Sequence, residues 1–180
     1  MPESLPQYLA QKHWRTPIFY ILPKIHKPGN PGRPIISQIE SPTSKLSKVV
    51  DIYLKPFIPN IPSYLKDTRF LQKLKALNKV PPQSILVTAD VTSLYTNIPH
   101  REGILAAKEM LEKRENEKPP TWILLRFIHF ILTENGFRFD DKYYMQKMGT
   151  SMGTIMAPEY AIIFMDKIER EFLKHNTKNH

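Results

Sequence analysis

The positions of hydrophobic residues along the chain predict an alternation of short strands and longer helices. Short apolar runs bounded by Gly, Pro, Asn or Ser are typical of strands, whereas apolar residues that recur every three or four positions are typical of helices. The strands are expected at residues 18–22, 33–37 and 85–90, and in a hairpin over 136–146. The helices are expected at residues 43–56, 67–78, 100–113 and 121–133, and after Gly153 to about residue 173.

Proline is concentrated in the first half, where 13 of the 17 prolines precede residue 91. Because proline interrupts helices and central strands, this half is expected to consist of short elements joined by extended connections rather than a helical bundle. Residues 23–32 must form a turn or loop, and residues 56–62 are expected to be irregular. The helix over 67–78 is expected to open at Asp67 and to close near Asn78.

Positive charge is concentrated in the same half of the chain. The formal net charge is +9, and residues 1–90 carry 13 Lys and Arg against 5 Asp and Glu. Such an asymmetry favours contact with a polyanion such as nucleic acid. A lysine-rich solvated surface is the alternative explanation.

Several classes of protein are excluded by composition. The chain has no cysteine, which excludes disulfide scaffolds and thiolate zinc sites, and its six histidines show no metal-ligand spacing. The most apolar run, residues 122–132, is too short to span a bilayer and contains Arg126 and His129, and the N-terminus lacks a signal-peptide pattern. We therefore expect an intracellular protein, nuclear or cytoplasmic, that is not secreted and has no membrane partner.

Asp90 is the most informative candidate for chemistry. It closes the apolar run 85–90, which is expected to be a buried strand, and Tyr95 follows five residues later. Two-metal phosphoryl transfer needs a rigidly held carboxylate that can bridge both ions, and a strand end can provide one. The alternative is a strand-end Asp that caps the next turn.

Three ordered blocks carry a family resemblance: residues 22–37, 90–99 and 149–158. Over about residues 19–165 the chain resembles the reverse transcriptase domain of Penelope-like retroelements, which are related to telomerase reverse transcriptase. The resemblance implies an α+β fold, the fingers and partial palm of a right-hand polymerase, with an incomplete antiparallel palm sheet and packed helices. It implies a fingers region at 1–84 and a partial palm at 85–180, with a helical insertion at 100–135.

The resemblance also implies an activity, RNA-directed DNA polymerisation by a two-metal mechanism. The implied partners are an RNA template, a DNA primer and deoxynucleoside triphosphates, and the implied cofactor is Mg²⁺, two ions in the intact enzyme, with Mn²⁺ as an alternative. Asp90 would be the catalytic metal ligand, and Val91 would offer its backbone carbonyl to the second ion.

Cations around the first loop are candidates for phosphate binding. Lys24 and Arg33 flank this loop, so both could reach a triphosphate, Arg33 with a bidentate fork and Lys24 as a point charge. Without the resemblance, two solvated loop cations would be the better interpretation. Lys27 and His26 are weaker candidates, for the template backbone.

The remaining candidates concern the sugar and the base pair. By resemblance, the ring of Tyr95 beneath the incoming ribose leaves no room for a 2′-hydroxyl and favours deoxynucleotides; a packed Tyr at a helix start is the alternative. Gln146, Gly149, Met152 and Gly153 would line the pocket of the nascent pair. Met152 stands where many reverse transcriptases have Gln, and it cannot donate the amide hydrogen bonds of Gln.

A second acidic motif is expected by resemblance after the long helix, and residues 1–180 do not contain it. Asp140 and Asp141 are rejected as a substitute because they fall at a hairpin tip, where paired Asp is typical of a turn. One carboxylate cannot hold two ions in register, so the chain is expected to be an inactive fragment that needs a further palm and thumb segment. The alternatives are a non-catalytic nucleic-acid-binding remnant of a retroelement and a fragment of an RNA-making polymerase.

Overall fold

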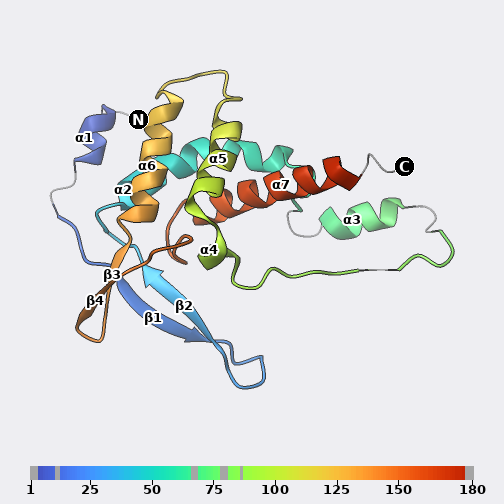
Figure 1. Ribbon diagram of the computed structural model, residues 1–180, viewed down its shortest axis with the longest axis horizontal. Helices are drawn as coiled ribbons and strands as arrows, with labels where there is room; N and C mark the ends of the chain where they lie inside the picture. Colours follow the sequence, from blue (N-terminus) through green and yellow to red (C-terminus); the bar gives the residue numbers. More distant parts are fainter. Residues whose placement is uncertain (1–3, 11–12, 66–68, 78–80, 86, 177–180) are drawn as a thin grey trace.

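A four-stranded sheet and a layer of helices make up the part of the chain that the computed structural model describes, residues 4–10, 13–65, 69–77, 81–85 and 87–176 (Figure 1). The strands are β1 (Ile18–Pro23), β2 (Gly32–Ser37), β3 (Gly136–Phe139) and β4 (Lys142–Met145), in the spatial order β2-β1-β3-β4. Both sequence-adjacent pairs are antiparallel hairpins, as predicted.

A parallel pairing between Ile18 of β1 and Arg138 of β3 joins the two hairpins. The α+β class is therefore confirmed, although the sheet is mixed rather than purely antiparallel. Phe19 packs against Phe137 and Phe139 across this junction, with ring centroids 5.7 and 5.1 Å away. Contact between these aromatic side chains joins two hairpins that are about a hundred residues apart in sequence.

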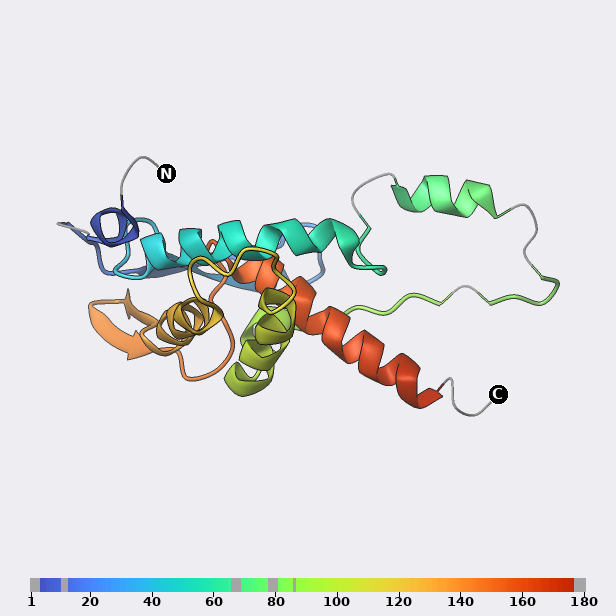
Figure 2. The same cartoon turned by 90° about the horizontal axis from the view of Figure 1, so that it is seen from above.

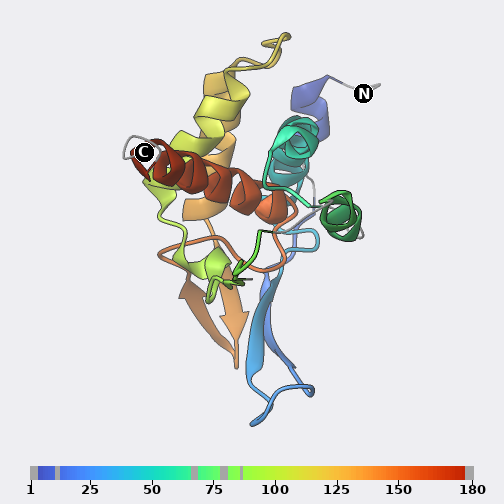
Figure 3. The same cartoon turned by 90° about the vertical axis from the view of Figure 1, so that its right-hand side faces the viewer.

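With the exception of α3 (Arg69–Ala76), the helices pack as a cluster, and the sheet extends from one end of it (Figure 3). They are α1 (Leu5–Leu9), α2 (Ser44–Leu54), the 3₁₀ helix η1 (Lys55–Asn60), α3 (Arg69–Ala76), α4 (Leu94–Asn97), α5 (His100–Leu111), α6 (Thr121–Thr133) and α7 (Ala157–Asn176). The core lies where α2, α5, α6 and α7 meet, and its largest fully buried side chains include Leu54, Leu111, Leu124, Ile128 and Tyr160. None of these helices, within the described ranges, is long and apolar enough to cross a bilayer.

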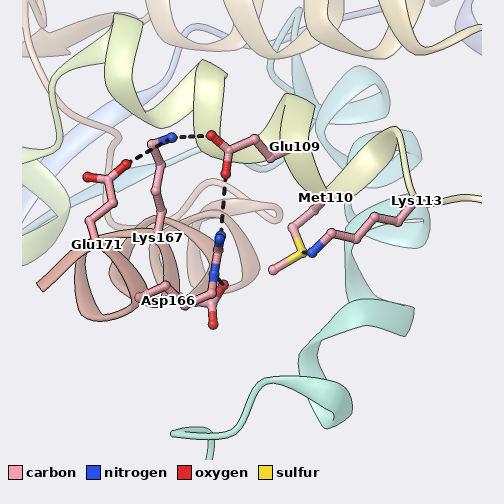
Figure 4. A network of polar contacts seen from close by, with 7 residues as sticks. Glu109, Met110, Lys113, Asp166, Lys167 and Glu171 are labelled. Carbon is pink, nitrogen blue, oxygen red and sulfur yellow. Dashed lines mark hydrogen bonds and ion pairs between the residues drawn. The ribbon is translucent and has the colours of Figure 1, made fainter. Parts of the chain in front are cut away.

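Charged side chains add a second connection between α5 and α7 (Figure 4). Glu109 of α5 accepts hydrogen bonds from Lys167 and Arg170 of α7, and the Arg170 Nε donates to the buried Asp166 at 2.8 Å. The hydrogen bond from Lys167 is the main cause that lowers the pKa of Glu109 below its ordinary value. Because Glu109 is partly exposed, solvent screening limits what this network contributes to about 1 kcal/mol.

The predicted strand over 85–90 is wrong. After a turn at 82–83, residues 84–85 and 87–91 run as a connection without ladder pairing, and Ile85 and Val87 are 85% and 78% exposed rather than buried. Figure 2 shows α3 standing apart from the helical cluster and this connection running back toward the cluster. An apolar β-prone run becomes a strand only when a neighbouring strand accepts its backbone hydrogen bonds, and the described residues supply none here.

Two local predictions concern turns and irregular segments. Asp140 and Asp141 both have positive φ, 48° and 57°, between β3 and β4, which is the geometry of a tight hairpin turn and agrees with their interpretation as turn residues. The segment expected to be irregular over 56–62 instead contains η1, because Pro56 and Pro59 are compatible with a short 3₁₀ helix. The expected helix signals Asp67 and Asn78 lie outside the described residues.

Candidate active-site cleft

A cleft of about 960 Å³ lies between the β1–β2 hairpin, the connection before α4 and the loop before α7. The hairpin contributes Lys24, Lys27, Gly32, Arg33, Pro34 and Ile35. The connection and α4 contribute residues 89–96, and the loop and the start of α7 contribute Met152, Gly153, Thr154, Ala157 and Pro158. Three segments that are distant in sequence thus share one concave surface.

The hairpin geometry brings its cations to the same side of the cleft. Leu22 pairs with Arg33, and the backbone N–H of Lys24 donates to the Pro31 carbonyl at 3.0 Å, so Lys24 and Arg33 stand at the base of the loop on opposite arms. Gly29 and Asn30 have positive φ angles of 75° and 45°, and this left-handed pair closes the loop. Since Lys27 also lines the cleft, three cations stand there with one carboxylate, Asp90, and the balance favours an anionic ligand.

Asp90 and Val91 are exposed on the cleft wall. The chain then turns into α4 through Ser93, whose φ of 52° lies in the left-handed region. Local bonds support this single turn, because Thr96 and Asn97 side chains donate to the Ser93 carbonyl at 3.0 and 3.1 Å. These bonds fix the backbone that follows Asp90.

Tyr95 is held by the loop that precedes α7. The Thr150 N–H donates to the Tyr95 carbonyl at 2.7 Å, and the His100 Nε2 lies 2.9 Å from the Gly149 carbonyl. Gly149 has φ of 73°, and a Cβ there would clash with the backbone of Tyr95 and Thr96. Burial, and to a lesser extent the nearby Glu159, raises the pKa of Tyr95, so its hydroxyl stays protonated at neutral pH.

The other glycine of the loop, Gly153, is the point where the loop contacts the β1–β2 hairpin. Its φ is 136°, and a Cβ would fall closer than 3.0 Å to the Ile36 carbonyl oxygen. The Ile36 N–H in turn donates to the Met152 carbonyl at 3.0 Å. Close backbone approach at Gly153 therefore sets the distance between two walls of the cleft.

Comparison with known families identifies the family of the chain. The family model described as reverse transcriptase (RNA-dependent DNA polymerase) matches residues 25–180, which contain the greater part of the cleft wall. The chain belongs to the reverse transcriptase family. A search of curated proteins found none that matches it. The family acts on a nucleic-acid template and primer with deoxynucleoside triphosphates and generally uses Mg²⁺.

Of the residues predicted for this reverse transcriptase site, most line the cleft. Those on its wall are Lys24, Lys27, Arg33, Asp90, Val91, Tyr95, Met152 and Gly153. His26 is exposed on the loop and is not on the cleft wall. Gly149 is buried behind Tyr95 and acts through its backbone. The structure brings these residues together, and the role of each one stays a prediction.

Gln146 lies off the cleft wall, in a chain of amide hydrogen bonds. Its Oε1 accepts from Asn135 at 3.0 Å, and its Nε2 donates to the Met148 carbonyl at 2.8 Å. The Asn135 Oδ1 accepts from the buried Gln38 of the segment after β2 at 2.8 Å. Gln146 thus holds the loop that leads to Gly149. Gln38 and Asn135 were not predicted from the sequence, because a single amide side chain belongs to no sequence pattern that indicates its hydrogen-bond partner.

The candidate donor atoms for a metal ion at this cleft are oxygens. The Asp90 carboxylate and the Val91 carbonyl are both hard ligands at the cleft, and Mg²⁺ is commonly bound by one or two carboxylates together with substrate phosphates. Within the described residues, no three His, Asp or Glu side chains gather closely enough to hold an ion by themselves. The donor set therefore fits a metal that arrives with a nucleotide.

Proposed function

We propose that the chain is the fingers and part of the palm of an RNA-directed DNA polymerase of the Penelope-like, retrotransposon-encoded type. The observation that carries the proposal is that Lys24, Lys27 and Arg33 of the β1–β2 hairpin line the same cleft as Asp90 and Tyr95. The strings Leu-Tyr-Thr-Asn-Ile-Pro at 94–99 and Gly-Thr-Ser-Met-Gly-Thr at 149–154 resemble those of Penelope-like elements and support that subtype. The reaction is attack of a primer 3′-hydroxyl on the α-phosphate of a deoxynucleotide.

Each cleft residue has a role in binding or orienting the substrates. Arg33 and Lys24 hold the triphosphate, with help from the partial positive charge of the α7 N-terminus, which begins at the cleft with Ala157. Tyr95 excludes the 2′-hydroxyl of a ribonucleotide. Asp90 and the Val91 carbonyl would hold Mg²⁺, which neutralises phosphate charge when it is bound.

Two ions require more carboxylates than the cleft offers among the described residues. We therefore propose that polymerisation needs a further palm and thumb segment, and that this chain alone binds nucleotides without extending a primer. A primer-extension assay tests this part: robust synthesis by residues 1–180 would refute it.

Nucleotide binding by the chain itself tests the cleft. Titration of dATP with Mg²⁺ should give saturable binding that Arg33→Gln weakens by about 10–100-fold, because a charge-assisted hydrogen bond contributes about 1.5–3 kcal/mol. The matched control is Arg138→Gln, since Arg138 is exposed on the same sheet at β3 and does not line the cleft. Equal loss in both variants would contradict a specific triphosphate site.

A non-catalytic nucleic-acid-binding protein is the second candidate, favoured by the single carboxylate among three cations. Asp90→Asn separates the two. In the polymerase, this change removes the Mg²⁺ dependence of dATP binding, whereas a purely electrostatic binder would hold RNA as well as before or better. The control is Asp140→Asn, at the exposed β3–β4 turn.

A further inference from the structure

His100 is a half-buried side chain that the proposed function does not use. It is the first residue of α5, directly after Pro99, and α5 is anchored in the core through Ala106, Ala107 and Leu111. A ring at this position has a rigid base. Its Nε2 reaches across 49 residues of sequence to the Gly149 carbonyl at 2.9 Å.

The proton in this bond must belong to the histidine, because a carbonyl oxygen only accepts. His100 therefore donates from Nε2. The carbonyl it holds belongs to the peptide unit whose N–H, that of Thr150, donates to the Tyr95 carbonyl at 2.7 Å. Donation into the carbonyl end of a peptide polarises its N–H, so the two bonds reinforce each other.

The position of the Tyr95 backbone is set by its neighbours rather than by its own helix. Tyr95 sits in α4, a single helical turn of four residues entered through the left-handed Ser93. One turn is too short to be stable by itself, so the position of Tyr95 depends on tertiary contacts. Gly149 packs directly against the Tyr95 backbone, in a space that a Cβ would fill.

We propose that His100 is a positioning residue for sugar selection: through Gly149 and Thr150 it fixes the backbone of Tyr95, and so the height of the Tyr95 ring beneath the incoming sugar. The proposal rests on the proposed function of Tyr95. A steric filter works only if its wall does not move, since a shift of about 1 Å is enough to admit or exclude a hydroxyl.

Two variants separate the donor from the shape of the ring. His100→Phe keeps a flat ring and removes the donor, whereas His100→Gln keeps an N–H donor at nearly the same reach. His129→Phe is the matched control, because His129 is exposed on α6. Circular dichroism and the urea midpoint establish that each variant is folded.

The first readout is amide hydrogen exchange at Thr150. His100→Phe should speed it by about fivefold, the equivalent of a hydrogen bond of about 1 kcal/mol, whereas His100→Gln and His129→Phe should leave it unchanged. The second is the ratio of dATP to ATP affinity with Mg²⁺. It should fall by a similar factor in His100→Phe and recover in His100→Gln.

The two readouts keep the possible failures apart. Unchanged Thr150 exchange in His100→Phe would overturn the proposal, as would equal loss in the Phe and Gln variants. Faster exchange with an unchanged dATP to ATP ratio would overturn the role in sugar selection. If the unaltered chain bound neither nucleotide while His100→Phe still loosened Thr150, the proposed function would fail, and with it the selection role.

Discussion

Gly153 is the residue at which replacement by alanine should damage the cleft most directly. Its φ of 136° lies in a region that L side chains rarely adopt, and an added methyl group would press into the carbonyl oxygen of Ile36 on β2. A backbone carbonyl cannot rotate away as a flexible side chain could. The loop and β2 must therefore separate, which stretches the hydrogen bond from the Ile36 N–H to the Met152 carbonyl.

The cost of Gly153→Ala can be worked from these two effects. A non-glycine residue in a sparsely populated backbone region costs about 1–3 kcal/mol. A hydrogen bond that is lost contributes about 0.5–1.5 kcal/mol. Together they give a loss of about 2–4 kcal/mol in the free energy of unfolding, a large fraction of the 5–15 kcal/mol that is typical of a domain.

Urea denaturation followed by circular dichroism measures this loss, with Gly29→Ala as the matched control. Gly29 also has a positive φ, 75°, but a Cβ there would meet nothing within 4 Å. Its replacement should cost only the backbone term, about 1–2 kcal/mol. If the two variants lost equal stability, the argument from close approach at Gly153 would be refuted. Binding of dATP should fall in Gly153→Ala alone.

Three further predictions concern the helical layer. Tyr160→Phe should raise the free energy of unfolding by about 1 kcal/mol in urea denaturation, because the buried Tyr160 hydroxyl finds no partner among the described residues; a loss would contradict this. Glu109→Gln should destabilise by about 1 kcal/mol or less at pH 7. Hydrogen bonding from Lys167 lowers the folded pKa of Glu109, so the stabilisation by Glu109 is complete above its ordinary pKa of 4.5. This stabilisation is lost as the pH falls through the folded pKa. The denaturation curves of variant and parent should therefore converge in acid. Burial and a hydrogen bond with Asp51 raise the folded pKa of Glu159, so ionisation of Glu159 destabilises the folded parent. The stability of Glu159→Gln relative to the parent should therefore increase as the pH rises from 4.5 through that pKa. No increase at pH 8 would refute this prediction.

Local pattern was sufficient for most elements of this fold. The helix over 121–133 has the predicted bounds, because its apolar residues recur at helical spacing and Pro120 precedes its first turn. Both hairpins were predicted from turn residues between β-prone runs. These signals are contained in a few neighbouring residues, so no tertiary information was needed.

Non-local contacts account for what the pattern missed. The parallel pairing of Ile18 with Arg138 joins segments with no shared motif, and α4 is a single turn with a left-handed entry that no periodicity announces. At the cleft, the sequence blocks indicated which side chains lie together. The hydrogen bonds that hold Tyr95, however, use the backbone atoms of Gly149 and Thr150. Backbone groups are the same in every residue, so the sequence could not single them out.

The exposed, unpaired connection that precedes Asp90 has a consequence for catalysis. Ile85, Val87 and Val91 are exposed in the described structure, at 85%, 78% and 48%, on the segment that carries Asp90. A nucleic acid presents phosphates and sugars to such a segment, and these do not cover aliphatic side chains well, whereas burial against protein is worth about 1.5–3 kcal/mol for each side chain. A protein segment that paired with this connection would hold Asp90 from its N-terminal side as well as through α4. The same apolar run that fails to form a strand among the described residues therefore supports the proposal that a further palm segment is needed before Asp90 is rigid enough for phosphoryl transfer.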